Sequence, residues 1–105
     1  MFAVLSLLLA CSSGVSVTID NQTGAPLTDV TVSVTGAERV IGEIPAGDQE
    51  TVLLSPSGES SITVQGAGFE EGAGYIESGY RGEVTFTMKP DGEVIIEDET
   101  KLPWL

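Results

Sequence analysis

The stretch Glu83-Val84-Thr85-Phe86-Thr87-Met88-Lys89 is followed directly by Pro90-Asp91-Gly92 and then by Glu93-Val94-Ile95-Ile96-Glu97-Asp98. In the first segment apolar residues alternate with threonine, which is the period of a strand that buries one face. An Asp-Gly pair between two such segments is typical of a β-hairpin turn. This stretch therefore predicts two antiparallel strands and indicates a β-rich fold.

Upstream of the hairpin, the same alternation recurs in short segments separated by turn-forming residues. It is clearest in residues 29–35, where valines occupy one face and threonine or serine the other. The upstream strands that we predict are residues 15–20, 29–35, 39–44, 50–55 and 61–65. Asn21-Gln22-Thr23 follows the first strand and matches a glycosylation sequon. We interpret it instead as turn chemistry, because Asn and Thr side chains bond readily to nearby backbone groups.

The strand pattern predicts an all-β fold. From residue 15 onward no segment repeats apolar residues at helical spacing. About seven short strands with turns at intervals of about 8–12 residues are typical of a small antiparallel β-sandwich, immunoglobulin-like or transthyretin-like. A small closed β-barrel is the alternative.

Residues 66–82 form the longest stretch without alternation, and they contain six of the 13 glycines and three of the six aromatic residues. Long loops in small domains commonly carry function. We therefore predict a partner-binding loop in which Phe69 is an exposed contact. In the alternative interpretation, Tyr75 and Ile76 form a further strand or cap the core, and Tyr75 is the residue most expected to serve as core. The predicted partner-binding residues are Phe69, Glu70, Glu71, Tyr75 and Tyr80.

The charge balance restricts the class of partner. Sixteen acidic and four basic residues give a formal net charge of −12. Such a surface repels nucleic acid and anionic lipid headgroups, and it attracts basic proteins or cationic ligands. A simpler explanation of the acidity is that it keeps the protein soluble.

The residues available for chemistry argue against an enzyme. The chain has no histidine and a single cysteine, Cys11, so it lacks the commonest general base and cannot form an internal disulfide. Paired carboxylates such as Glu70-Glu71 can hydrolyse glycosides, but only in a walled cleft. No calcium-binding loop motif is present. We therefore predict no catalytic residue, no metal site and no cofactor.

The segment Leu8-Leu9-Ala10-Cys11 ends an apolar run that begins at Met1. It resembles the lipobox of bacterial lipoprotein precursors. The resemblance implies cleavage before Cys11, a lipid on its thiol, and a protein anchored to a membrane of the cell envelope. Because Ser12 follows the cysteine, where the retention signal of the inner membrane has Asp, it favours the outer membrane. The apolar run is too short to cross a bilayer, and its lack of a basic start indicates that Met1 falls inside a longer signal.

The resemblance and the strand pattern together divide the chain into four parts. Residues 1–10 are the predicted signal peptide, residues 11–14 the lipidated start and linker, and residues 15–99 the sandwich. Residues 100–105 are an apolar tail that includes Trp104 and is expected to dock on the sandwich. One domain, and no more, fits this length.

Two functions follow from these expectations. The first is a non-enzymatic envelope lipoprotein whose acidic sandwich binds a protein or polymer. The alternative is an inhibitor or immunity lipoprotein that neutralises a basic toxin or lytic enzyme in the periplasm. Small acidic lipoproteins of the second kind are known, but the fragment Ser78-Gly79-Tyr80 does not suffice to assign this chain to them.

Overall fold

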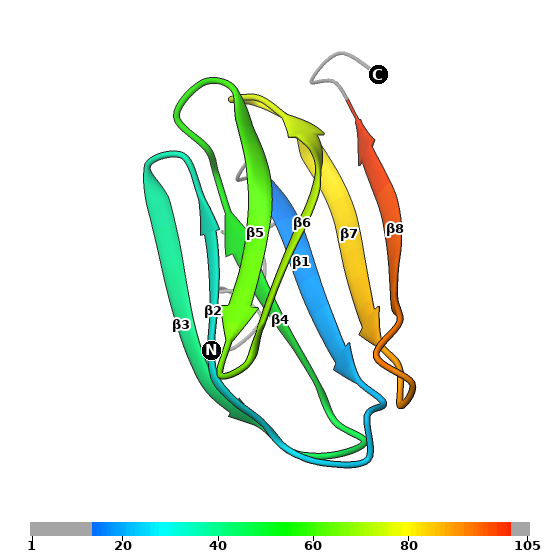
Figure 1. Cartoon of the computed structure of the whole chain (residues 1–105). Helices are drawn as coiled ribbons and strands as arrows, with labels where there is room; N and C mark the ends of the chain where they lie inside the picture. Colours follow the sequence, from blue (N-terminus) through cyan, green and yellow to red (C-terminus); the bar gives the residue numbers. More distant parts are fainter. Residues whose placement is uncertain (1–13, 102–105) are drawn as a thin grey trace, which may run out of the picture.

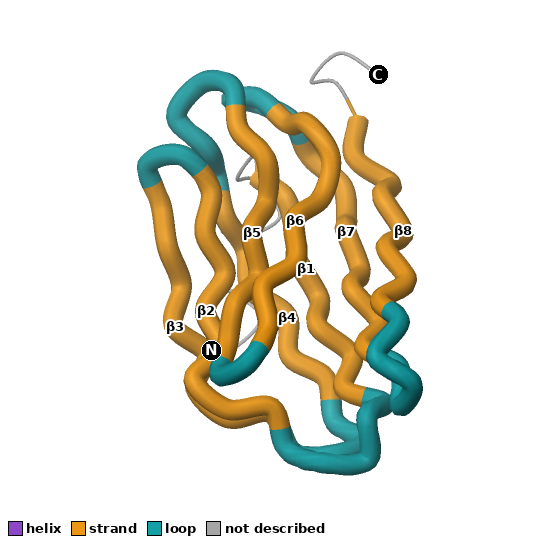
Figure 2. Tube along the Cα trace, viewed as in Figure 1, coloured by secondary structure: helices purple, strands orange, loops and turns teal. Residues whose placement is uncertain are grey.

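The computed structural model describes residues 14–101, and within them eight strands form two four-stranded sheets packed face to face (Figure 1). The described residues contain strands and short loops and no helix, as Figure 2 shows. The strands are β1 (Gly14–Asn21), β2 (Leu27–Val34), β3 (Ala37–Ile44), β4 (Gln49–Leu54), β5 (Ser60–Gly66), β6 (Phe69–Ile76), β7 (Arg81–Met88) and β8 (Val94–Lys101). The predicted β-sandwich is confirmed. The alternative of a closed barrel is wrong, because the two sheets have separate edges.

The two sheets differ in one pairing. The first sheet has the order β4-β1-β7-β8 and the second β3-β2-β5-β6. β1 runs parallel to β7 and antiparallel to β4, while every other pair is antiparallel. This order leaves β4 and β8 at the edges of the first sheet, and β3 and β6 at the edges of the second.

The core lies between the sheets and is formed by the alternating apolar residues that the sequence predicted. On β7, Val84, Phe86 and Met88 face the core, and their neighbours in sequence do not. Each buried aliphatic or aromatic side chain contributes about 1.5–3 kcal/mol through its removal from water. The buried apolar residues are Val15, Val17, Ile19, Val30, Val32, Ile44, Leu54, Ile62, Val64, Ala73, Ile76, Val84, Phe86 and Met88.

The predicted hairpin between β7 and β8 is confirmed in detail. The backbone N–H of Lys89 donates to the carbonyl of Glu93 at 2.9 Å, and that of Gly92 donates to the carbonyl of Lys89 at 3.1 Å. Gly92 has a φ of 90°, a conformation that glycine adopts without steric cost. The Asp91 carboxylate accepts the N–H of Glu93 at 3.0 Å, which fixes the turn.

The prediction that residues 66–82 are irregular is wrong, because β6 lies within them. This strand pairs with β5, but its register shifts by one residue between Ala73 and Ile76. Gly74, with a φ of 52°, lies in this bulge. A bulge moves the following residues to the opposite face, so Ala73 and Ile76 both reach the core although they are three positions apart. The pattern therefore lacks the period of two that identifies strands in sequence.

Asn21 is the only buried polar residue in the described chain, and its environment confirms the interpretation of Asn21-Gln22-Thr23 as turn chemistry. Its side-chain oxygen accepts bonds from the N–H and the hydroxyl of Thr23, at 3.0 and 2.7 Å. Its amide nitrogen donates to the carbonyls of Ala25, Ile44 and Pro45, at 2.8, 2.9 and 3.2 Å. Asn21 therefore holds the β1–β2 and β3–β4 connections together.

The limits of the sandwich are slightly wider than predicted. β1 begins at Gly14, which was assigned to the linker, and β8 continues to Lys101, two residues past the predicted end of the domain. The lipobox with Cys11, the signal peptide and the apolar tail with Trp104 lie outside the described residues. Among residues 14–101 there is no helix of the length and apolar character needed to span a bilayer.

Candidate functional site

A cavity of about 370 Å³ opens between the two sheets at one end of the sandwich. Figure 1 shows that the turns joining β5 to β6 and β7 to β8 lie at this end, together with the β1–β2 connection. The lining comes from all three connections and the strand ends beside them, so no single stretch of sequence builds it. The lining residues are Thr23, Leu27, Gly68, Phe69, Glu70, Glu71, Met88, Lys89, Gly92, Glu93 and Val94.

Phe69 forms one wall of this cavity and is positioned by a glycine. It is the first residue of β6 and lies opposite Gly66 of β5. A Cβ on Gly66 would lie 2.5 Å from the Phe69 ring and 2.8 Å from the carbonyl oxygen of Thr28, so only glycine lets the ring lie there. Phe69 is half-buried and packs against the core. The prediction that it is a fully exposed loop contact is therefore wrong.

The apolar wall opposite Phe69 comes from the hairpin of the first sheet. Met88 and Val94 face each other across β7 and β8, and Leu27 at the start of β2 lies near them. The sequence analysis did not assign these residues to the site. The hairpin pattern does pair Met88 with Val94, but it carries no information about which part of the other sheet they face.

Carboxylates surround the apolar lining. Glu71 lies opposite the buried Val64, so its side chain is on the core-facing side of β6 at the open edge, and it is half-buried. Glu70 and Glu93 are exposed at the rim, and Lys89 is the one basic residue among the lining residues. The cavity is thus an apolar recess with an acidic rim, which suits an aliphatic side chain next to a cation.

The two tyrosines of the predicted site lie at the other end of β6. Tyr75 and Tyr80 make an edge-to-face contact with ring centroids 6.5 Å apart. The Tyr75 hydroxyl donates to the Glu77 carboxylate at 2.7 Å, and this bond raises the pKa of Tyr75 to about 12. Tyr75 is 51% exposed, so the expectation that it serves as core is wrong, whereas Tyr80 packs against the core. The structure therefore brings Phe69, Glu70 and Glu71 together and separates them from the tyrosines.

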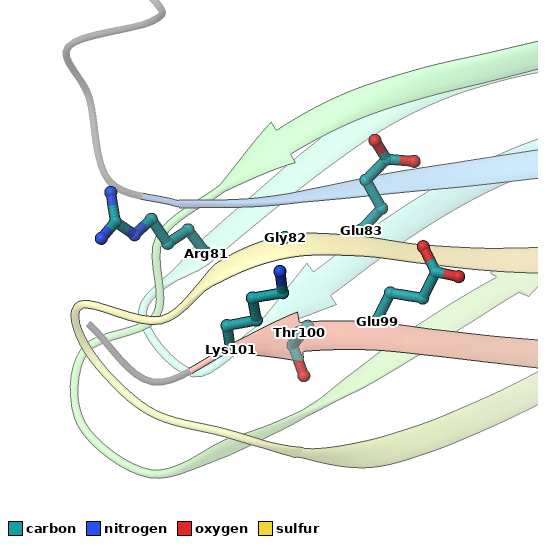
Figure 3. Close-up of a pocket in the computed structure, with 6 residues that line it drawn as sticks. All are labelled: Arg81, Gly82, Glu83, Glu99, Thr100 and Lys101. Atoms are coloured by element: carbon teal, nitrogen blue, oxygen red, sulfur yellow. The ribbon is translucent and has the colours of Figure 1, made fainter. Parts of the chain in front are cut away.

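A larger hollow of about 710 Å³ lies beside β7 and β8 at the tyrosine end. Figure 3 shows Arg81, Glu83, Glu99 and Lys101 on one side of the two strands and Thr100 on the other. Arg81 lies opposite Lys101, and Glu83 lies opposite Glu99. The lining residues of this hollow include no aliphatic or aromatic residue. It therefore offers no recess for an apolar group, and the smaller cavity is the better candidate for a binding site.

The carboxylates do not gather into a recognisable metal site. Within residues 14–101, no group of three or more Asp, Glu, Cys or His side chains is arranged to hold a metal ion. No buried side-chain nitrogen or oxygen in this range lacks a hydrogen-bond partner. The chemistry that the cavity offers is apolar contact combined with negative charge.

Comparison with known proteins adds information on the fold. An NMR structure of a protein from Eubacterium rectale is similar, with a TM-score of 0.51 and 13% sequence identity. The match covers 84% of this chain and 90% of that protein. No model of a protein family matches the sequence, and no curated protein matches it. At this identity the similarity supports the architecture alone.

Proposed function

We infer that this protein is a non-enzymatic, lipid-anchored protein of the cell envelope that binds a basic segment of a partner protein. The observation that carries the proposal is the acidic rim of the cavity around Phe69. An apolar recess supplies contact area, and the rim of Glu70, Glu71 and Glu93 attracts and selects a basic partner. The net charge of −12 extends this attraction over the whole surface.

The position of the cavity supports a role away from the anchor. Cys11 precedes Gly14 by three residues, so a lipid on Cys11 holds the Gly14 end of β1 within about 10 Å of the membrane surface. β1 has eight residues, and at about 3.4 Å per residue its ends lie roughly 24 Å apart. The cavity is at the Asn21 end, because Thr23 and Met88 line it. A partner in solution therefore meets the cavity without contacting lipid.

The anchor itself is tested by Cys11→Ser. We expect this variant to incorporate no lipid and to move from the membrane to the soluble fraction or to stay uncleaved, because acyl chains supply about 0.8 kcal/mol per buried methylene. Incorporation of radiolabelled palmitate and cell fractionation measure both effects. Ser12→Ala is the matched control and should keep the lipid. A Cys11→Ser protein that is still cleaved and membrane-bound would refute the anchor.

The binding site is tested by photocrosslinking in intact envelopes. A photoreactive amino acid replaces Lys89 in the cavity of the full-length protein, and a second version carries it at Val40, an exposed position of β3 that is remote from the cavity. We expect an adduct with a basic protein from position 89 and not from position 40. Adding Phe69→Ala should reduce the yield about tenfold or more, which corresponds to about 1.4 kcal/mol of lost contact.

Phe69 also packs against the core, so a stability control is needed. Ile41 on β3 is another half-buried residue that packs against the core but does not line the cavity. Ile41→Ala should lower the melting temperature to a similar extent and leave the adduct unchanged. Equal adducts from positions 89 and 40, equal loss with Ile41→Ala, or an acidic partner would each contradict the proposal. A toxin or lytic enzyme in the adduct would identify the protein as an inhibitor.

A further inference from the structure

Four strands lie at sheet edges in the described residues, and they differ in how well they could accept another strand. β3 and β6 carry register shifts, near Gly42 and Gly74, which interrupt a regular edge. β4 has only six residues. β8 has eight residues, contains neither proline nor glycine, and pairs with β7 without a shift from Arg81–Lys101 to Met88–Val94. A long regular edge is the natural template for an added strand.

The hairpin shows which backbone groups of β8 point away from β7. Lys89 donates to the carbonyl of Glu93, and these residues lie opposite each other. Because bonded and non-bonded pairs alternate along an antiparallel ladder, the odd-numbered residues of β8 bond to β7. The backbone groups of Val94, Ile96, Asp98 and Thr100 therefore face the outer edge. The Thr100 N–H supports this, since it donates to the side chain of Asp98 at 3.0 Å rather than to β7.

The side chains of β8 favour one kind of neighbour. Glu97 and Glu99 lie on the outer face of the sheet, opposite Thr85 and Glu83, and Asp98 lies on the other face. A second copy of β8 would bring these acids against one another, which is unfavourable, whereas a strand with lysine or arginine would be attracted. Ile95 and Ile96 are 41% and 37% exposed, one on each face, and an added strand would cover them.

We propose that β8 accepts an extended basic segment of a partner protein as a further strand of the first sheet. The segment has alternating character: its cations lie over Glu97 and Glu99, and its apolar side chains lie over Ile96. Beyond Ile96 the same face leads to Val94, which lines the cavity with Phe69. The last apolar side chain of the segment enters that cavity. This inference rests on the proposed function, because it describes how the same partner is held.

The test uses the full-length protein and a synthetic peptide in which lysine and valine alternate, with binding measured by calorimetry. Ile96→Pro removes an N–H that faces the outer edge and leaves the bonds to β7 intact, a position where edge strands tolerate proline. We expect Ile96→Pro to weaken binding at least about tenfold, because both an edge hydrogen bond and close approach are lost. Ile96→Ala, which keeps the N–H, should weaken it about threefold or less.

A second measurement leaves the protein unchanged. The same peptide with N-methyl groups on alternate backbone nitrogens keeps its side chains and charge but cannot bond to a strand edge, and it should bind at least about tenfold more weakly in one of the two methylation registers. This comparison decides the question even if Ile96→Pro fails to fold. A peptide in which glutamate replaces lysine should not bind.

The outcomes separate this inference from the proposed function. If Phe69→Ala weakens binding but Ile96→Pro and both N-methylated peptides bind as the parents do, the added strand is wrong and the cavity remains the site. If neither Phe69→Ala nor the backbone changes matter, both proposals are wrong. Self-association of the protein that is lost in Ile96→Pro would show that β8 pairs with a second copy instead, and would also overturn the inference.

Discussion

Val17→Asp should leave the protein unfolded at room temperature. Val17 is fully buried in β1, in the interior of the first sheet, between Val52 of β4 and Val84 of β7. None of these neighbours can compensate a carboxylate. An uncompensated buried charge costs about 5 kcal/mol or more, which is comparable to the whole stability of a small domain, about 5–15 kcal/mol. The loss is measured by chemical denaturation and by circular dichroism.

The matched control is Val40→Asp, the same substitution at a residue that is 76% exposed on β3. It should change the stability by less than about 1 kcal/mol. The carboxyl group that Val17→Asp introduces has its pKa raised by desolvation, so its penalty is smallest below the pKa of the unfolded chain, about 4, and grows as the pH rises. The Val17→Asp protein should therefore regain some structure on acidification. A cooperative melt near that of the wild type at neutral pH would mean that Val17 is not in the core.

Asn21→Asp should be the second most damaging change, although it replaces one atom. The Asn21 amide nitrogen donates to three carbonyls, and a carboxylate would place a charged acceptor against them. Loss of the donors and burial of a charge together should cost about 3–5 kcal/mol. Asn21→Ala, which leaves the carbonyls without a donor but adds no charge, should cost somewhat less. Urea denaturation at neutral pH measures both.

Gln22→Glu provides the control, because it makes the same amide-to-acid change at the next residue, which is partly exposed and lies outside the core. Gln22 donates to Asp20 at 3.0 Å, so this variant should lose no more than about 1 kcal/mol. Protonation of the carboxylate that Asn21→Asp introduces restores one donor at low pH, and the gap between this variant and the wild type should narrow below about pH 5. If both variants were equally stable, the hydrogen bonds of Asn21 would not hold the two connections together.

The acids on β8 also explain why a long regular edge is tolerated in a free protein. Exposed edges promote association with other chains, and charge on the edge is one of the ways in which proteins prevent it. The negative charge of Glu97, Asp98 and Glu99 prevents pairing between copies and leaves the edge open to a basic partner. Under this interpretation solubility and partner selection have the same physical origin.

The sequence by itself determined the class of fold and most of its strands. Alternation is a local property, so β1, β2, β5 and β7 could be identified from neighbouring residues, and Pro90-Asp91-Gly92 fixed the hairpin and the pairing of Met88 with Val94. Strands at the edges were less regular. Val94, Ile95 and Ile96 do not alternate, because β8 is exposed on both faces and neither face must be apolar throughout.

The tertiary structure alone decided the site. β6 is a strand because β5 pairs with it and a bulge at Gly74 changes its phase, and neither fact can be read from its glycine-rich sequence. Phe69 is half-buried and Tyr75 exposed, the reverse of what their neighbours in sequence indicated, because burial depends on which side of the bulge a residue lies. The cavity arises where Phe69 of one sheet meets Met88 and Val94 of the other. Contacts between sheets join residues that are distant in the chain, and a pattern with a period of two residues carries no information about them.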